Sequence, residues 1–142
     1  MAENNKSLTV SKVINADRET IFEALTNGEI MQKWFYAGAD GWSATVENDP
    51  KVGGKYQIDM HGKNDTYSHE GKYKEIIPNE KLVFTWNSHA VQDTVVTITL
   101  SEVNGGTEVK LKHDFLPNEE MKKNHTEGWK QILIHLNSVV VG

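Results

Sequence analysis

Residues 125–136, HTEGWKQILIHL, decide the fold of this sequence. They belong to a longer segment after Pro117 in which apolar side chains recur at helical spacing, and this period predicts one amphipathic helix that closes the chain. The predicted apolar stripe comprises Met121, His125, Gly128, Trp129, Ile132, Leu136 and either Val139 or Val140. Gly128 is the unexpected member of this stripe, because glycine in a helix interior costs about 1 kcal/mol relative to alanine. We therefore expect Gly128 to have a structural role in the fold that offsets this cost.

Segments of alternating polarity precede this helix and predict an antiparallel sheet. In residues 55–60, KYQIDM, the side chains of Tyr56, Ile58 and Met60 share one face, as in a strand with one buried side. Further segments of this kind are residues 67–77, 81–87, 94–103 and 107–115. Tight connections separate some of them, and residues 104–107, NGGT, contain the Asn-Gly pair that favours hairpins. We expect these strands to form a meander.

The N-terminal part predicts a strand followed by two short helices. Residues 7–16 are rich in β-branched side chains, residues 16–27 place apolar side chains at helical spacing, and residues 28–38 predict a second short helix that ends in an aromatic cluster. A sheet with an apolar inner face must be covered, and only the C-terminal helix is long enough to do so. We therefore predict an α+β helix-grip fold, a curved antiparallel sheet wrapped around the C-terminal helix, in a single domain of residues 1–142.

The composition excludes several classes of protein. The chain has 142 residues, which is the length of one ordinary domain. It has 15 basic and 20 acidic side chains and no basic cluster, so nucleic acid is not an expected partner. It has no cysteine, and its N-terminus lacks the basic and apolar regions of a signal peptide, so we expect a cytoplasmic protein. No apolar run approaches the roughly 20 residues of a membrane span, and none is expected.

Several segments together resemble a known family. These segments are KVGGKYQIDM, EGKYKEIIPNEKLVFTW, VTITL, GGTEVKLKHDF and HTEGWKQIL. In this order and spacing, over about residues 8–141, they resemble the C-terminal homology domain of the activator of the heat-shock protein 90 ATPase. That family lies within the START-like superfamily, which shares the helix-grip fold with the birch pollen allergen, lipid-transfer domains and polyketide cyclases. The resemblance implies a cavity between the sheet and the long helix.

Such a cavity offers two reasons for Gly128. Without a Cβ atom, this residue either lets the helix approach the sheet closely or leaves space for a ligand, and each gain would offset the helix propensity that glycine loses. The sequence does not separate these two possibilities.

The ligand-binding side chains that we predict come from the sheet, the short helices and the long helix. They are Trp34, Tyr56, Met60, Tyr73, Trp86, His113, His125, Gly128, Trp129 and Ile132. We expect His113 and His125 to share a cavity wall, either as polar anchors for an otherwise apolar ligand or as partly buried histidines that bond to backbone or water. The aromatic side chains either face a planar ligand or pack as plain core, and for Trp34, near the expected mouth, both interpretations are open.

The histidines do not form a recognisable metal motif. No pair among the 6 histidines has the spacing H-x-x-x-H or H-E-x-x-H, and no cysteine is present, so we predict neither a metal nor a cofactor. Acid–base chemistry in the cavity would need an imidazole or a carboxylate with a shifted pKa. The candidates are His69, Glu70, His113 and His125, with Glu70 expected on the outer face of the sheet.

These observations predict a non-catalytic protein that holds a hydrophobic small molecule, aromatic or lipid-like, in the cavity. The family resemblance implies a second function, a stress-related co-chaperone with a chaperone as partner. The eukaryotic activator also has an N-terminal domain that binds the chaperone, and 142 residues are too few for both domains, which counts against this function. The superfamily implies a third, a cyclase-like or hydratase-like enzyme with His113 or His125 as the base.

Overall fold

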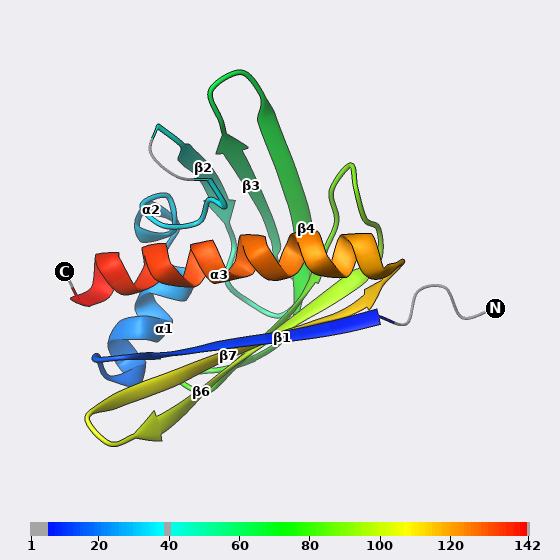
Figure 1. Cartoon of the computed structure of the whole chain (residues 1–142). Helices are drawn as coiled ribbons and strands as arrows, with labels where there is room; N and C mark the ends of the chain where they lie inside the picture. Colours follow the sequence, from blue (N-terminus) through cyan, green and yellow to red (C-terminus); the bar gives the residue numbers. More distant parts are fainter. Residues whose placement is uncertain (1–5, 39–40, 142) are drawn as a thin grey trace.

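The computed structural model describes residues 6–38 and 41–141, and it confirms the predicted helix-grip fold. The described part of the chain forms seven strands and three helices, and Figure 1 shows the long helix α3 lying across the sheet. In chain order the elements are β1 (Lys6–Ile14), α1 (Arg18–Thr26), α2 (Gly28–Met31), β2 (Ser43–Asn48), β3 (Lys55–His61), β4 (Thr66–Ile77), β5 (Lys81–Trp86), β6 (Thr94–Val103), β7 (Gly106–Leu116) and α3 (Glu119–Val141).

The sheet is antiparallel throughout. Its strand order is β1-β7-β6-β5-β4-β3-β2, so the strands from β2 to β7 form the predicted meander. β1 is the exception, because it pairs with β7 at the other end of the sequence, with Leu8 opposite His113. This pairing joins the first strand to the last and leaves β1 and β2 as the two edges of the sheet.

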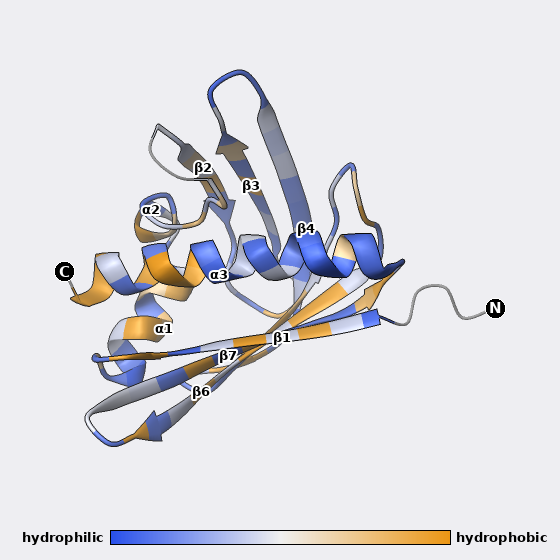
Figure 2. Ribbon diagram, viewed as in Figure 1, coloured by the Kyte–Doolittle hydropathy of each residue, from blue (hydrophilic) through white to orange (hydrophobic). Residues whose placement is uncertain are grey.

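The inner face of the sheet and one face of α3 form the core. Along β6, the side chains of Val96, Ile98 and Leu100 are buried while the residues between them are partly exposed, as expected for a strand with one buried side. On α3, Trp129 and Leu136 are among the buried residues. Figure 2 shows hydrophobic residues toward the C-terminal end of α3 and a more hydrophilic N-terminal half.

Two elements differ from the sequence prediction. The predicted second helix over residues 28–38 is too long, because α2 ends at Met31 and the aromatic cluster lies in the turns that follow. Trp34 is buried there, and its Nε1–H donates to the carbonyl of Ala24 at 3.0 Å, so tertiary packing places this residue. β2 has no counterpart among the predicted strands. It is a short edge strand in which no residue is fully buried, so its hydrophobic pattern is weak.

Candidate functional site

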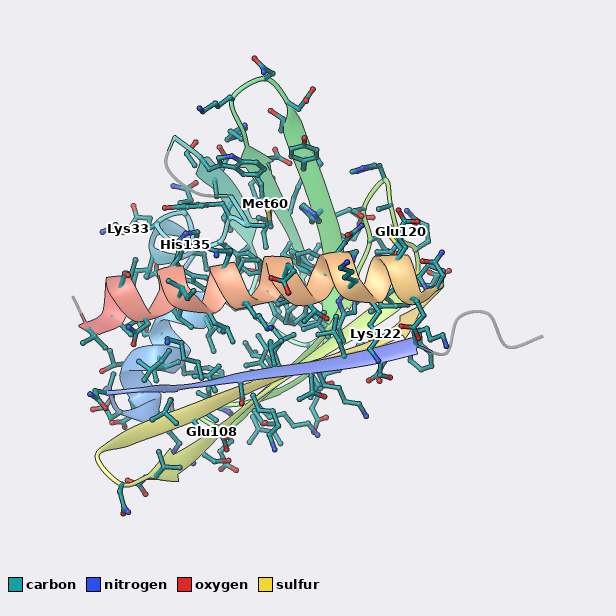
Figure 3. All side chains as sticks on the ribbon, in the orientation of Figure 1. Lys33, Met60, Glu108, Glu120, Lys122 and His135 are labelled. Carbon is teal, nitrogen blue, oxygen red and sulfur yellow. The ribbon has the colours of Figure 1, made fainter. Side chains whose placement is uncertain are left out.

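A pocket opens between α3 and the sheet. Its volume is about 160 Å³, and we call it the α3 pocket. Figure 3 shows Met60 on β3, facing α3 across this region. The lining residues are Ala37, Met60, His69, Trp86, Asn124, His125, Gly128, Trp129 and Ile132. Six of the ten residues predicted from the sequence thus lie around one pocket, namely Met60, Trp86, His125, Gly128, Trp129 and Ile132.

Three of the predicted residues lie elsewhere, in the closed core. Trp34, Tyr56 and Tyr73 surround an apolar void of about 10 Å³, which holds one water molecule at most. Their polar atoms are already paired: the hydroxyl of Tyr56 donates to the carbonyl of Thr85 at 2.6 Å, and that of Tyr73 donates to Oδ1 of Asn48 at 2.5 Å. Burial raises the pKa of Tyr73 to about 12. These residues act as core in this structure and do not line the α3 pocket.

His113 is fully buried and both of its ring nitrogens are bonded. The hydroxyl of Thr94 donates to the carbonyl of Trp86 at 2.5 Å, so its oxygen accepts the proton on Nε2 of His113 at 2.9 Å. Nδ1 of His113 in turn accepts from Nε1–H of Trp129 at 3.0 Å. Burial, with a smaller effect from His125, lowers the pKa of His113 to about 3. This imidazole is therefore neutral, with no free lone pair, and it fixes the orientation of Trp129.

His125 differs from His113 in being only partly buried. Its Nδ1 lies 2.8 Å from the carbonyl oxygen of Met121, which can only accept, so Nδ1 carries the proton. Nε2 has no hydrogen-bond partner among the described residues. The ring lies edge to face with that of His113, at a centroid distance of 5.2 Å. Burial lowers the pKa of His125, and the bond to Met121 opposes that shift.

His69 and Trp86 form the sheet side of the pocket. Their rings lie 4.6 Å apart, and Nδ1 of His69 and Nε1 of Trp86 are buried without a partner among the described residues. Burial lowers the pKa of His69 to about 4, with smaller contributions in the same direction from His125 and His89. Glu70, the neighbour of His69 on β4, is exposed, in agreement with its expected place on the outer face.

Gly128 does not mark a close approach of α3 to the sheet. Of the described residues outside the backbone of α3, a Cβ atom placed there would meet only the Cβ of Ala37, at 3.6 Å, which is ordinary van der Waals contact. Ala37 belongs to the segment after α2, which α3 holds through Nδ1 of His135 donating to the carbonyl of Tyr36 at 2.9 Å. The missing side chain at Gly128 thus enlarges the opening between α3 and this segment.

Three lining residues were not among the predicted ligand-binding residues. His69 could have been included, because in β4 it has the same parity as the inward residues Gly71 and Tyr73. Asn124 could have been included too, since it lies one helical turn before Gly128 on the same face. Ala37 lies outside any helix or strand, so no periodicity indicates it.

A comparison with protein families identifies the chain. The family model described as Activator of Hsp90 ATPase homolog 1-like protein matches residues 15–140. The chain belongs to this family. Membership in the Activator of Hsp90 ATPase homolog 1-like family confirms the resemblance inferred from the sequence segments, and the matched range includes every residue of the α3 pocket.

Solved structures share the fold of this family member. A protein from Chromobacterium violaceum has 24% sequence identity and a TM-score of 0.85, over 94% of this chain and 96% of that chain. An AHSA1-like protein from Aeromonas hydrophila has 20% identity and a TM-score of 0.82, over 95% and 92% of the two chains. A protein from Nitrosomonas europaea has 19% identity and a TM-score of 0.79, over 94% and 92%. At these identities the likeness shows the fold, and no curated protein matches the chain.

The chemistry open to this family member follows from the groups in its pocket. Within residues 6–38 and 41–141, no three histidine, cysteine or acidic side chains are grouped so as to hold a metal ion. No helix in the described part of the chain is long and apolar enough to cross a membrane. The α3 pocket offers apolar and aromatic walls, two imidazoles and one amide, which suit non-covalent binding of a small molecule.

Proposed function

We propose that the chain binds a hydrophobic small molecule about the size of one aromatic ring in the α3 pocket. The observation that carries this proposal is the pocket volume of about 160 Å³. An engineered protein cavity of roughly 150 Å³ accommodates benzene, whereas pockets for drug-sized ligands have volumes of roughly 300–1,000 Å³. A single ring therefore fits better than a lipid chain.

The walls of the pocket support an aromatic ligand. The rings of Trp86 and Trp129 lie 4.8 Å apart and are both buried at the base of the pocket, while Met60 and Ile132 add flexible and branched apolar surface. Tryptophan rings favour offset or edge-to-face contacts with another ring. Because His113 fixes Trp129 through its indole nitrogen, this part of the wall is held in place before a ligand arrives.

Apolar contact alone would give weak binding. A ring that loses about 150 Å² of apolar surface gains roughly 4 kcal/mol at 25 cal/mol per Å². That value corresponds to a Kd of about 1 mM before the cost of association is subtracted. We therefore expect an unsubstituted ring to bind with a Kd of about 1 mM at best, and more tightly only where polar contacts are added.

An NMR titration with benzene tests the proposal. Saturable shifts are expected at the backbone amide of Gly128 and at the indole N–H signals of Trp86 and Trp129. The indole signal of Trp34 serves as an internal control, because that group bonds to Ala24 in the core away from the pocket. Absence of saturable shifts around Gly128 up to the solubility of benzene would refute the proposed function.

The family match favours one further candidate, an interaction with a chaperone. Its test is the ATP turnover of purified Hsp90 with increasing amounts of this protein. Dose-dependent acceleration would support a chaperone partner, and unchanged turnover at a molar excess would count against it. An enzymatic function of the cyclase or hydratase kind would have to use His125 as base, because both ring nitrogens of His113 are bonded.

A further inference from the structure

We infer that the ligand of the α3 pocket is a phenol-like molecule, a single aromatic ring whose hydroxyl group donates a hydrogen bond to Nε2 of His125. This inference rests on the proposed function and adds the chemical class of the ligand. It depends on the protonation pattern of one imidazole, on the absence of charge in the pocket wall and on the way the imidazole is held.

The tautomer of His125 leaves a hydrogen-bond acceptor in the pocket. A backbone carbonyl only accepts hydrogen bonds, so the contact of 2.8 Å between Nδ1 and the carbonyl of Met121 places the proton on Nδ1. In the neutral imidazole the other nitrogen, Nε2, is then an acceptor. Nε2 has no partner in the part of the chain that the structure describes, and His125 lines the pocket. A ligand that satisfies it must bring a donor.

The lining of the α3 pocket is uncharged as far as the structure describes it. The described lining residues contain no aspartate, glutamate, lysine or arginine, so a carboxylate in the pocket would find no cation among them to pair with. Burying an unpaired charge is strongly unfavourable. Burial also lowers the pKa of His125 and of the neighbouring His69 and His113, which keeps all three imidazoles neutral at pH 7. A hydroxyl with the pKa of a phenol, about 10, stays neutral at that pH and supplies the donor.

The imidazole of His125 is held in position by its neighbours. The ring of His125 packs edge to face on His113, and His113 is itself bonded to Thr94 and Trp129. These contacts hold the acceptor in place before binding, which reduces the ordering cost. Nδ1 of His69 also lacks a partner, but it is shielded from solvent and is therefore out of reach of a ligand in the pocket as it stands. Of the two imidazoles in the lining, His125 is thus the one whose acceptor a ligand can reach.

A ligand series separates this inference from the proposed function. Phenol, anisole, benzene and benzoate share one ring, but only phenol carries a hydroxyl donor. One hydrogen bond to the partly buried imidazole of His125 should make phenol bind roughly tenfold more tightly than benzene or anisole in NMR titrations at pH 7. Equal affinities of phenol and benzene, or tighter binding of benzoate than of phenol, would overturn the inference and leave the proposed function intact. Binding of none of the four would refute the proposed function itself.

Two variants assign the preference to one residue. In His125→Phe a ring that can pack on His113 remains while the acceptor is lost, so the ratio of phenol affinity to benzene affinity should fall from roughly ten to about one. His89→Phe is the matched control, because His89 is exposed and does not line the pocket. Its preference for phenol should equal that of the unchanged chain. A preference that survives in His125→Phe would overturn the inference.

A direct measurement on the unchanged protein does not depend on the folding of a variant. The ¹⁵N chemical shifts of the imidazole nitrogens distinguish a protonated nitrogen from an unprotonated one. We expect Nε2 of His125 to be unprotonated in the free protein, and its signal to move toward the hydrogen-bonded position when phenol is added. A protonated Nε2 in the free protein, or a signal that phenol leaves unchanged, would overturn the inference.

Discussion

Replacing Gly128 by leucine would test whether the α3 pocket is usable space. Helical side chains point toward the N-terminus of their helix, so a leucine at this position would extend over the preceding turn, toward Asn124 and His125. Both of those residues line the pocket, and the first atom of the new side chain would meet only Ala37, at 3.6 Å. The leucine would therefore occupy the volume that we assign to the ligand.

The expected change in stability has two parts with the same sign. Removing a glycine from the interior of α3 recovers about 0.8–1 kcal/mol of helix propensity. Each CH₂ group that the leucine buries in the pocket adds up to about 0.8 kcal/mol, less the entropy of fixing the side chain. We expect the free energy of unfolding of Gly128→Leu to rise by about 1 kcal/mol, whereas overpacking of a closed interface would lower it by about 1–3 kcal/mol.

Chemical denaturation and a ligand titration measure the two consequences together. Gly128→Leu should bind benzene and phenol at least tenfold more weakly than the unchanged chain, because side chain and ligand compete for one volume. Gly128→Ala is the control, since it gains the same propensity of about 1 kcal/mol but adds a single carbon, so its ligand affinity should be nearly unchanged. A loss of stability above about 1 kcal/mol in the leucine variant, with ligand affinity unchanged, would refute the reasoning.

Three further outcomes are expected. In the folded chain the pKa of His113 is about 3 and that of His69 is about 4, against the ordinary value of 6.5. Between these values and pH 6.5 the unfolded chain binds more protons than the folded chain. The free energy of unfolding therefore falls as the pH is lowered through this range. At pH 5 the loss from His113 alone should be about 2 kcal/mol in urea denaturation, and a flat profile from pH 7 to 5 would contradict its buried neutral state. Thr94→Val leaves Nε2–H of His113 without an acceptor and should destabilise the fold by about 1–3 kcal/mol, whereas Thr97→Val, on the outer face of the same strand, should change stability by less than about 0.5 kcal/mol. A strong chelator should leave the Tm unchanged, and a marked drop would reveal a metal site.

The sequence predicted secondary structure best for strands and helices that have one buried side and one side exposed to solvent. β3, β5 and β6 follow the predicted alternation, because each buries one face against α3 or the remaining core. β2 has no fully buried residue, so its sequence carries little of that pattern. The turns after α2 were misassigned for a related reason, because Trp34 and its neighbours are placed by contacts with distant residues.

The site was only partly predictable from the same signals. Periodicity identifies the inward residues of a strand or helix, but it does not say which of them meet at an opening and which close the core. Tyr56 and Met60 illustrate this limit, since they share the inner face of β3 while only Met60 lines the α3 pocket. The protonation pattern of His125 was not predictable either, because it depends on hydrogen bonds that appear only in the folded chain.

The pairing of β1 with β7 sets a condition on synthesis of the protein. Leu8 lies opposite His113, so about 100 residues must be added after Leu8 before its partner residue exists. At translation rates of roughly 5–20 residues per second, that interval lasts about 5–20 s. During this time Leu8, Val10 and Ile14, which are buried in the finished protein, have no sheet to pair with. β1 is thus made well before the strand with which it pairs, and between these two events the nascent chain carries an unpaired apolar strand.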